Sequence, residues 1–302
     1  MSTIEKALAK QKLSNAEKAT DNSATQTDAS VVQSQARETI ADASQTAPLR
    51  SGTINQQCDI VLHQQNLVQR GYLFDATDRR LTQEEFRHIK RKLLNNAFGT
   101  GSKVLQHSNL VMVSSSNPNE GKTFVSINLA LSIALEQDKT VLLIDSDVLR
   151  PSIARELGFE EKTGLVEYLL SEVTSIQQVM YSTNIPNLKI IPSGKRHHLT
   201  NELLASQRMA SLANELASRY PDRIVIFDCP PILGVTETPV LANLMGQAVI
   251  VVEESKTKIN DIKKATSQLN EDLAIGFVMN KTLKSTKETY GYYGYGYGAK
   301  SQ

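Results

Sequence analysis

Short apolar runs alternate with segments of helical periodicity from residue 109 to the neighbourhood of residue 281. The apolar runs cover residues 110–113, 141–144, 188–191, 224–227, 248–252 and 275–279. The helical segments between them cover residues 123–136, 165–170, 201–219, 238–245 and 259–269. Strands that are apolar along their whole length are buried on both faces, which is typical of a parallel sheet between two layers of helices. We therefore predict a doubly wound α/β fold with a mostly parallel sheet.

A Gly-Lys-Thr sequence follows the first apolar run and opens the first helical segment. The loop reads Ser-Ser-Ser-Asn-Pro-Asn-Glu-Gly-Lys-Thr over residues 114–123, which is the position and chemistry of a P-loop. In such a loop, backbone N–H groups and the helix N-terminus bind phosphates, Lys122 reaches the β- and γ-phosphates, and the Thr123 hydroxyl ligates Mg²⁺. Ser116 and Asn119 stand where these loops often carry Gly, but Asn accepts a left-handed backbone better than other side chains.

Carboxylates follow two more of the predicted strands. Asp145 and Asp147 come directly after the second run, and Asp228 ends the fourth. Each of them could be only a helix cap or a turn residue. In an open α/β sheet, however, ligands bind at the carboxyl ends of the strands, where the P-loop also lies. Three carboxylates there can serve a Mg²⁺ ion and a proton acceptor around one triphosphate, so we predict ATP and Mg²⁺ as cofactors.

Charge and composition exclude several classes of protein. The net charge of +1 gives no general reason to bind nucleic acid. No apolar run approaches the roughly 20 residues of a membrane span, and the opening residues lack the apolar core of a signal peptide. The two cysteines, Cys58 and Cys229, exclude a disulfide framework and a multi-cysteine cluster. These features predict a cytoplasmic protein.

The first part of the chain differs from the α/β region. Residues 14–57 are dominated by small polar residues and Ala, without an aromatic residue. Such a stretch cannot bury enough apolar surface to offset the entropy of ordering, and we predict a largely disordered linker over residues 14–79. Ahead of it, residues 1–13 place Ile4, Ala7 and Leu8 on one face of a short helix. This segment is either a frayed polar end or a docking helix.

The last part of the chain is rich in tyrosine. Five of the nine tyrosines lie between residues 290 and 298, separated mostly by glycines; they are Tyr290, Tyr292, Tyr293, Tyr295 and Tyr297. A run interleaved with glycine does not form a helix, so we predict a flexible tail over residues 282–302. Exposed tyrosines suit the substrate segment of an autophosphorylating kinase. The alternatives are a low-complexity tail or a stacking surface for nucleic acid.

Three motifs resemble those of one family, the bacterial protein-tyrosine kinases that use Walker motifs. They are the loop at residues 117–123, the Asp-Ser-Asp-Val-Leu-Arg-Pro sequence at 145–151, and Phe-Asp-Cys-Pro-Pro at 227–231. The similarity extends over residues 80–298 and is greatest to autokinases of exosortase-associated exopolysaccharide loci. One departure is Leu149, which stands where many members have Arg, with Arg150 directly after it.

Residues 80–98 are predicted as an amphipathic helix with Thr82 as its N-cap. Glu84, Arg87 and Lys90 in this helix resemble the family's E-x-x-R-x-x-R oligomerisation motif, with Lys in place of the final Arg. The resemblance therefore implies a homo-oligomer, of which a ring is one form.

The resemblance also implies a function for residues 80–281 as a kinase domain. The chain would be an ATP-dependent tyrosine autokinase that phosphorylates a neighbour's tail in trans and regulates exopolysaccharide synthesis or export. Its partners would be a separately encoded membrane polysaccharide copolymerase as activator and a cognate tyrosine phosphatase, with no nucleic acid. Recruitment by the copolymerase would place it peripherally at the inner face of the plasma membrane.

The family pattern assigns a role to each candidate site residue. Nucleotide binding is assigned to Asn119, Glu120, Gly121, Lys122, Thr123 and Phe124, with Asn280 at the adenine. Mg²⁺ binding is assigned to Thr123, Asp147 and Asp228. Asp145 would orient and deprotonate the incoming tyrosine while Asp147 assists at the metal, although these two roles could be exchanged.

Two other functions are compatible with the same fold. Partitioning and division-site ATPases carry a signature Lys early in the loop, where this chain has Asn117, and they need no tyrosine tail. An ATP-gated scaffold that regulates a membrane polymerase by binding alone would bind ATP but acquire no phosphotyrosine.

Overall fold

The computed structural model describes residues 58–72, 80–103, 105–197 and 200–282. The predicted docking helix, most of the predicted linker and the five clustered tyrosines lie outside these residues. Within the described residues, no helix combines the length and the apolar character that a membrane span requires.

A seven-stranded sheet forms the centre of the described region, in the order β3-β4-β2-β5-β1-β6-β7. Its strands are β1 (Leu110–Ser115), β2 (Thr140–Asp145), β3 (Tyr181–Ser182), β4 (Leu188–Ile191), β5 (Arg223–Asp228), β6 (Gln247–Glu253) and β7 (Ala274–Asn280). Every pairing is parallel except that of β3 with β4. All six predicted strands are present, and the mostly parallel sheet is confirmed. The short strand β3 was not predicted.

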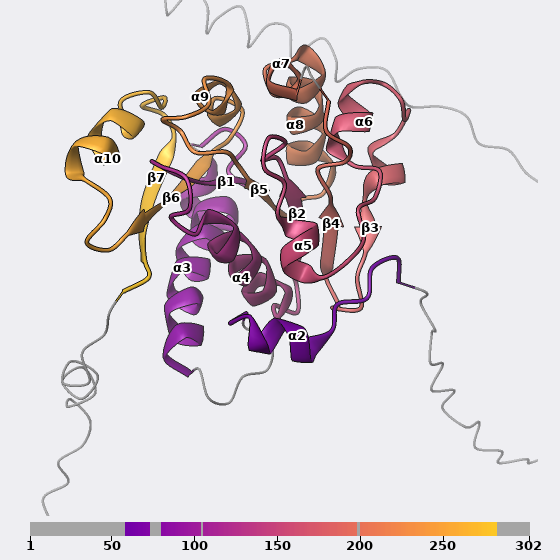
Figure 1. Ribbon diagram of the computed structural model, residues 1–302, viewed down its shortest axis with the longest axis horizontal. Coiled ribbons are helices and arrows are strands. Elements are labelled where there is room, and N and C mark those ends of the chain that lie inside the picture. The colour runs from indigo at the N-terminus through magenta and orange to yellow at the C-terminus, as the bar shows by residue number, and fades with distance from the viewer. Residues whose placement is uncertain (1–57, 73–79, 104, 198–199, 283–302) are drawn as a thin grey trace, which may run out of the picture. The chain divides into compact units, whose positions relative to one another are not determined.

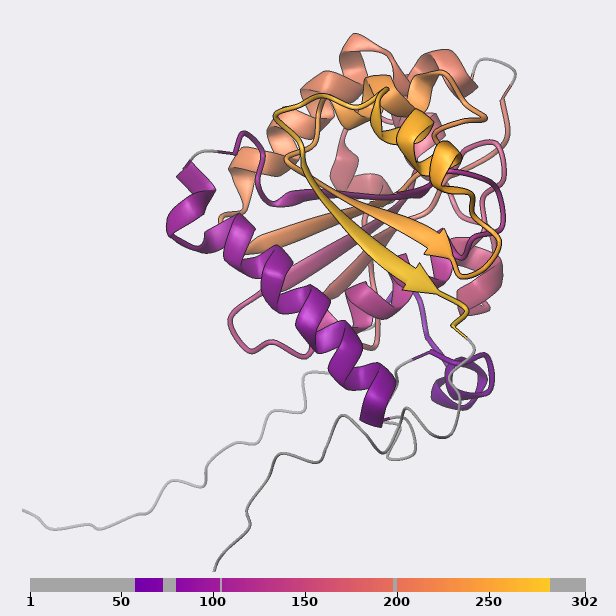
Figure 2. The same cartoon turned by 90° about the vertical axis from the view of Figure 1, so that its left-hand side faces the viewer.

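Helices cover both faces of the sheet (Figures 1 and 2). One face carries α2 (Gln64–Gln69), α3 (Arg80–Phe98), α4 (Lys122–Ala134) and α5 (Ile153–Leu157). The other carries α6 (Leu165–Leu169), α7 (Thr200–Leu204), α8 (Gln207–Arg219), α9 (Glu237–Ala242) and α10 (Ile259–Thr266). Two 3-10 helices, η2 (Thr100–Lys103) and η3 (Ile176–Val179), complete the described elements. This arrangement confirms the doubly wound fold.

Each central strand contributes side chains to both cores. In β1, Leu110 and Met112 belong to one apolar cluster, whereas Val111 and Val113 belong to the other. Successive side chains of a strand point to opposite faces of the sheet. A strand between two helical layers therefore needs an apolar residue at every position, which is the pattern that the sequence carries.

Three local features differ from the sequence-based expectation. Residues 58–72, assigned to the linker, fold against the domain, because a few apolar residues such as Leu67 are buried there. The helix α3 begins at Arg80, so Thr82 lies within its first turn and is not its N-cap. The helix predicted over residues 201–219 is two helices, and the Ser206 side chain caps the second by accepting a hydrogen bond from the backbone of Met209.

The order of the strands brings the predicted site together. The strand β5 lies between β1, which leads into the P-loop, and β2. Asp145 at the end of β2 is in register with Asp228 at the end of β5. Because the three strands are parallel, their carboxyl ends share one edge of the sheet.

Candidate functional site

The P-loop connects β1 to α4 through two residues in the left-handed region. Asn119 has a φ of 67°, and Gly121 has a φ of 98°. The sequence-based expectation that Asn119 accepts a left-handed backbone is therefore confirmed. A Cβ atom on residue 121 would lie 2.0 Å from Nδ2 of Asn280, so a glycine is required there by space as well as by conformation. The loop thus places the first turn of α4 at the carboxyl edge of the sheet.

Lys122 lies among carboxylates at the start of α4. Its Nζ is 2.6 Å from Oδ2 of Asp147, and the two side chains are 12% and 3% exposed. Burial favours a lower pKa of Lys122, but the charges of Asp228 and Asp147 outweigh it and raise the pKa. The lysine is therefore positively charged at neutral pH, with a partner that phosphates of a nucleotide can replace.

Two hydroxyl groups on α4 hold the Asp228 carboxylate. Thr123 donates to Oδ2 at 2.7 Å and Ser126 donates to Oδ1 at 3.0 Å. Burial raises the pKa of Asp228, although Lys122 and Thr123 oppose the shift. Ser126 was not predicted, although it lies one turn beyond Thr123 and so shares its helix face.

The site fits a magnesium ion bound mainly through its nucleotide. Thr123 and Asp228 offer oxygen atoms in direct contact with each other. Among the described residues, no three His, Cys, Asp or Glu side chains form a cluster that could hold a metal. Mg²⁺ keeps several waters and binds through one or two protein oxygens plus substrate phosphates. The residues present therefore match that mode of binding and not an all-protein metal cage.

Asp145 is held differently from Asp147. Its side chain is 1% exposed, and Oδ2 accepts hydrogen bonds from the backbone N–H groups of Ser152 and Ile153, both at 3.0 Å. Its Oδ1 has no hydrogen-bond partner in the described part of the chain. Burial, and then the nearby Asp228 charge, raise the pKa of Asp145 to about 8. A shifted carboxyl group with one unused oxygen is a candidate for proton transfer.

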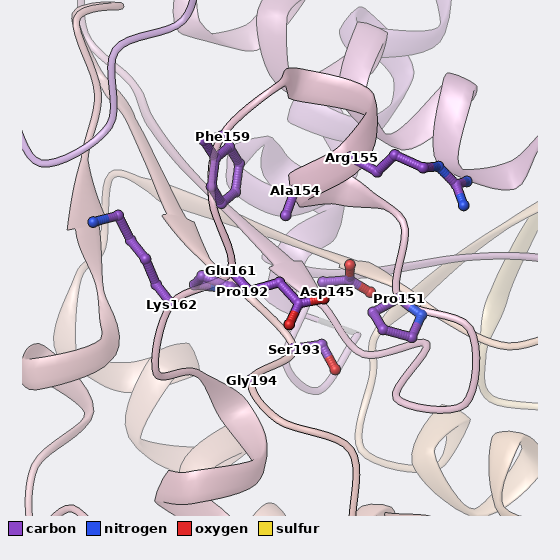
Figure 3. Close-up of a pocket in the computed structure, with 10 residues that line it drawn as sticks. All are labelled: Asp145, Pro151, Ala154, Arg155, Phe159, Glu161, Lys162, Pro192, Ser193 and Gly194. Atoms are coloured by element: carbon purple, nitrogen blue, oxygen red, sulfur yellow. The ribbon is translucent and has the colours of Figure 1, made fainter.

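Two cavities open at this edge of the sheet. A cavity of about 650 Å³ is lined by the P-loop, Asp147 and the residues after it, with Arg70, Tyr72 and Arg196 at its wall. A smaller cavity of about 210 Å³ contains Asp145 (Figure 3). Its other lining residues include Pro151, Ala154, Phe159, Pro192 and Ser193. Ser193 is 4% exposed, and its hydroxyl, like Oδ1 of Asp145, has no hydrogen-bond partner among the described residues.

Comparison with known proteins shows to which family this chain belongs. Residues 110–275, more than half of the chain, match the AAA domain family. The chain is 33% identical over 229 residues to the tyrosine-protein kinase YwqD of Bacillus subtilis (strain 168). The matched region covers 75% of this chain and 92% of YwqD. The chain belongs to the bacterial tyrosine-protein kinases. The predicted family and enzyme class are therefore confirmed.

Other relatives of the kinase agree with this assignment. It is 35% identical over 196 residues to the putative tyrosine-protein kinase EpsB of Ralstonia solanacearum, and the match covers 64% of this chain. The chain spans about a quarter of the length of EpsB, since 25% of that protein is covered. The solved BceF tyrosine kinase domain has a TM-score of 0.57 and 26% identity, and the match covers 67% of this chain and 78% of that chain.

Two residues of the kinase that are predicted to bind nucleotide, Glu120 and Asn280, have side-chain contacts that hold the P-loop itself. Asn280 donates from Nδ2 to the backbone carbonyl of Glu120 at 2.9 Å. The Glu120 side chain is 2% exposed and accepts hydrogen bonds from the Asn117 backbone and the Thr257 hydroxyl. Neither side chain lines the large cavity, whereas Asn119, Gly121 and Phe124 do. These side-chain contacts of Glu120 and Asn280 brace the loop, and the binding of nucleotide by the loop backbone and of adenine by Asn280 stays a prediction.

The predicted oligomerisation residues of the kinase are divided between the surface and the interior. Arg87 and Glu84 form an ion pair with each other on the exposed side of α3. Lys90 is 6% exposed, donates to the Ser132 carbonyl at 3.0 Å and pairs with Glu136 at 2.5 Å. Lys90 therefore connects α3 to α4 within the domain, and the expectation that it contacts a neighbouring subunit does not agree with this position.

Proposed function

We propose that this kinase binds ATP and Mg²⁺ in the 650 Å³ cavity and transfers the γ-phosphoryl group to tyrosine. The observation that carries the proposal is the convergence of Lys122, Thr123, Asp145, Asp147 and Asp228 at one edge of the sheet. Phosphoryl transfer depends mainly on positioning and on neutralising charge, which this arrangement of one lysine and three carboxyls can supply.

Each residue of the P-loop side has a defined task in this proposal. Lys122 leaves Asp147 and binds the β- and γ-phosphates, while the N–H groups at the start of α4 bind phosphate oxygens. The Thr123 hydroxyl and the Asp228 and Asp147 carboxylates would hold Mg²⁺. The bound ion supplies charge neutralisation on the transferred group. When Lys122 binds the phosphates, its ion pair with Asp147 is broken, and the Asp147 carboxylate becomes available to the metal.

Asp145 accepts the proton of the incoming tyrosine. The phenol oxygen forms a bond to the γ-phosphorus, the bond from that phosphorus to the leaving oxygen of ADP breaks, and the phenol proton goes to the unpartnered Oδ1. Only the ionised form of Asp145 can accept this proton, and with a pKa of about 8 that form is the minority at neutral pH. The same raised pKa makes the carboxylate a stronger base and brings it closer to the phenol, whose pKa is near 10, so transfer late in the reaction is feasible. Pro151, Phe159 and Pro192 line the 210 Å³ cavity together with Asp145 and suit an aromatic ring.

The acceptors we propose are the clustered tyrosines, Tyr290 to Tyr297, of a neighbouring copy. About 15 residues separate Thr282 from Tyr297, and an extended chain covers at most ~3.3–3.6 Å per residue, so the tail reaches roughly 50 Å. The strand β7, which precedes the tail, ends at the same edge of the sheet as the site. This reach permits transfer between subunits brought together through the exposed part of α3 around Glu84 and Arg87.

The cellular role we propose is control of exopolysaccharide synthesis or export. It follows from the resemblance to autokinases of exopolysaccharide loci. The partners would be a membrane polysaccharide copolymerase, which recruits the kinase to the inner face of the plasma membrane, and a tyrosine phosphatase that reverses the modification.

The direct test is incubation with ATP and Mg²⁺ followed by phosphotyrosine mapping by mass spectrometry. We expect phosphate in the tail of the natural chain and none in Lys122→Met, which removes the charge that binds the γ-phosphate. Asp145→Asn should reduce the transfer rate more than the affinity for ATP, because a base acts mainly in the transition state. ATP binding without any phosphotyrosine would instead favour the scaffold function.

A mixing experiment separates transfer in trans from transfer in cis. Lys122→Met with an intact tail is mixed with an active variant in which the five clustered tyrosines are replaced by Phe. Phosphate on the tail of Lys122→Met can come only from the other copy. An unmodified tail in this mixture, with a normally modified natural chain, would contradict transfer in trans.

A further inference from the structure

Residues 58–72, called here the strap, are anchored at the β3 edge of the sheet. The backbone N–H of Ile60 donates to the Ser182 carbonyl at 3.0 Å. Leu62 and Asn184 exchange two hydrogen bonds, at 2.7 and 3.0 Å. Ile60 and Leu62 are only 2% and 1% exposed. This end of the strap is therefore part of the apolar core.

The other end of the strap contacts the last turn of α5. Arg70 donates from Nη1 to the carbonyl oxygens of Arg155 and Glu156, at 2.7 and 3.1 Å. The Tyr72 hydroxyl donates to Oε2 of Glu156 at 3.0 Å, and its ring lies 5.5 Å from that of Phe124. The last carbonyls of a helix have no partner within the helix. Arg70 thus caps α5 from outside, while Tyr72 connects it to the residue that follows Thr123.

The first turn of α5 contacts the catalytic residues. Ser152 and Ile153 donate their backbone N–H groups to Oδ2 of Asp145. The Ser152 hydroxyl is 2.8 Å from that of Thr123. The helix itself has five residues, and so short a helix is not stable without contacts to the rest of the protein. Its position therefore depends on what holds it at both ends.

We propose that the strap is a positioning element of the catalytic centre. Arg70 and Tyr72 hold the carboxyl end of α5, and the amino end of α5 then holds the Asp145 carboxyl through Oδ2 at the wall of the smaller cavity. Arg70 and Tyr72 touch no reacting atom in this proposal and are positioning residues. The expected effect of the strap on the reaction rate rests on the proposed phosphoryl transfer, whereas its expected effect on the position of α5 does not.

A simpler role for the same residues would be to form a wall of the ATP cavity. Arg70 and Tyr72 do line the 650 Å³ cavity. A wall would change the affinity for ATP and leave the start of α5 unaltered. A positioning element would change the start of α5 and the transfer rate, even when ATP saturates the kinase. These two roles can therefore be separated by experiment.

The first experiment measures amide hydrogen exchange in the nucleotide-free full-length protein. Arg70→Ala should accelerate exchange at Ser152 and Ile153 by about tenfold or more, because local opening becomes easier. The matched control is Gln65→Ala, an exposed position of the strap in α2, which should leave exchange unchanged. Unchanged exchange in folded Arg70→Ala would overturn the proposal.

A milder variant covers the case in which Arg70→Ala does not fold. Tyr72→Phe keeps the ring against Phe124 and removes only the hydrogen bond to Glu156. It should accelerate exchange at the same two amides by a smaller factor, while Gln65→Ala again serves as control. Exchange equal to that of the natural chain in Tyr72→Phe would overturn the proposal if Arg70→Ala cannot be measured.

The second experiment separates kcat from KM for ATP in the kinase reaction. Arg70→Ala should lower kcat roughly ten- to hundredfold, the usual consequence of a misplaced catalytic group, with little change in KM. Glu156→Gln keeps an oxygen acceptor for Tyr72 and should keep most of the activity. A higher KM with an unchanged kcat would overturn positioning in favour of the wall.

If the natural chain forms no phosphotyrosine, the proposed function fails, and hydrogen exchange alone decides whether the strap positions Asp145.

Discussion

Replacing Asp145 by Asn should stabilise the nucleotide-free protein, and more at pH 7 than at pH 5. The Asp145 carboxyl is buried, and its pKa is about 8 instead of the ordinary 3.8. Between these two values the folded protein keeps a proton that the unfolded chain releases. The contribution of Asp145 to stability is therefore complete below about pH 4 and is lost progressively as the pH rises to about 8. An Asn side chain has no proton to lose over this range.

The size of the effect follows from the width of this pH window. Both pH 5 and pH 7 lie inside it, and each pH unit costs about 1.4 kcal/mol of folding free energy, so the loss between them is about 3 kcal/mol. In a domain of this size 1 kcal/mol shifts Tm by about 2–4 °C, so the difference in Tm between Asp145→Asn and the natural chain should grow by roughly 6–12 °C from pH 5 to pH 7. The Asn oxygen can still accept from Ser152 and Ile153, so the fold should be retained.

Thermal unfolding of both proteins between pH 5 and pH 8 measures this difference. Other titrating groups are common to the two proteins and cancel when the variant is compared with the natural chain at each pH. The matched control is Asp272→Asn, which changes an exposed carboxyl. Its difference in Tm from the natural chain should not increase between pH 5 and pH 7. An equal advantage of Asp145→Asn at pH 5 and pH 7, or a loss of stability at pH 7, would refute a raised pKa for Asp145.

Three further perturbations test other parts of the structure. Lys90→Ala should lower stability by about 1–3 kcal/mol, because it removes the buried hydrogen bond to the Ser132 carbonyl and the ion pair with the partly exposed Glu136. It should leave the subunit mass by sedimentation unchanged. Arg87→Ala, on the surface, should scarcely affect stability. Gly121→Ala should weaken ATP binding measured by calorimetry, because residue 121 has a φ of 98° and Asn280 occupies the space that a Cβ would need. Adding Asn280→Ala should restore only the part of the affinity that is lost through the steric clash. Phosphorylated protein should sediment as smaller assemblies than dephosphorylated protein at equal concentration and salt, because each phosphate adds about −1.5 to −2 charges; equal masses would contradict a cycle of association and separation.

The sequence by itself was sufficient for the sheet and for the chemistry of its edge. Short continuous apolar runs such as residues 110–113, alternating with helical segments, are typical of strands that are covered on both faces. The Gly-Lys-Thr loop after the first run and the carboxylates Asp145 and Asp228 after two others then predicted a shared site. Parallel strands end at one edge, whatever the order in which they pair, and so this inference did not require the topology.

The division of labour among these residues was decided by tertiary structure. Asp145 and Asp147 are two residues apart and chemically identical, yet one is held by the backbone of α5 and the other pairs with Lys122. Tertiary structure also decided the position of Lys90, because its place in an amphipathic helix is compatible with the surface and with the interior alike. Its burial depends on the Ser132 carbonyl, 42 residues away.

The strap shows why such features escape a reading of the sequence. Seven of its 15 residues are apolar, but they follow a long polar stretch, and composition assigned the whole of residues 14–79 to a linker. Tyr72 is nevertheless buried through contacts with Phe124 and with Glu156, which is 84 residues further along the chain. Periodicity reports whether a segment has an apolar face, and it carries no information about which distant side chain will cover that face. Only the packing of α4 and α5 on the sheet creates the surface on which the strap is stable.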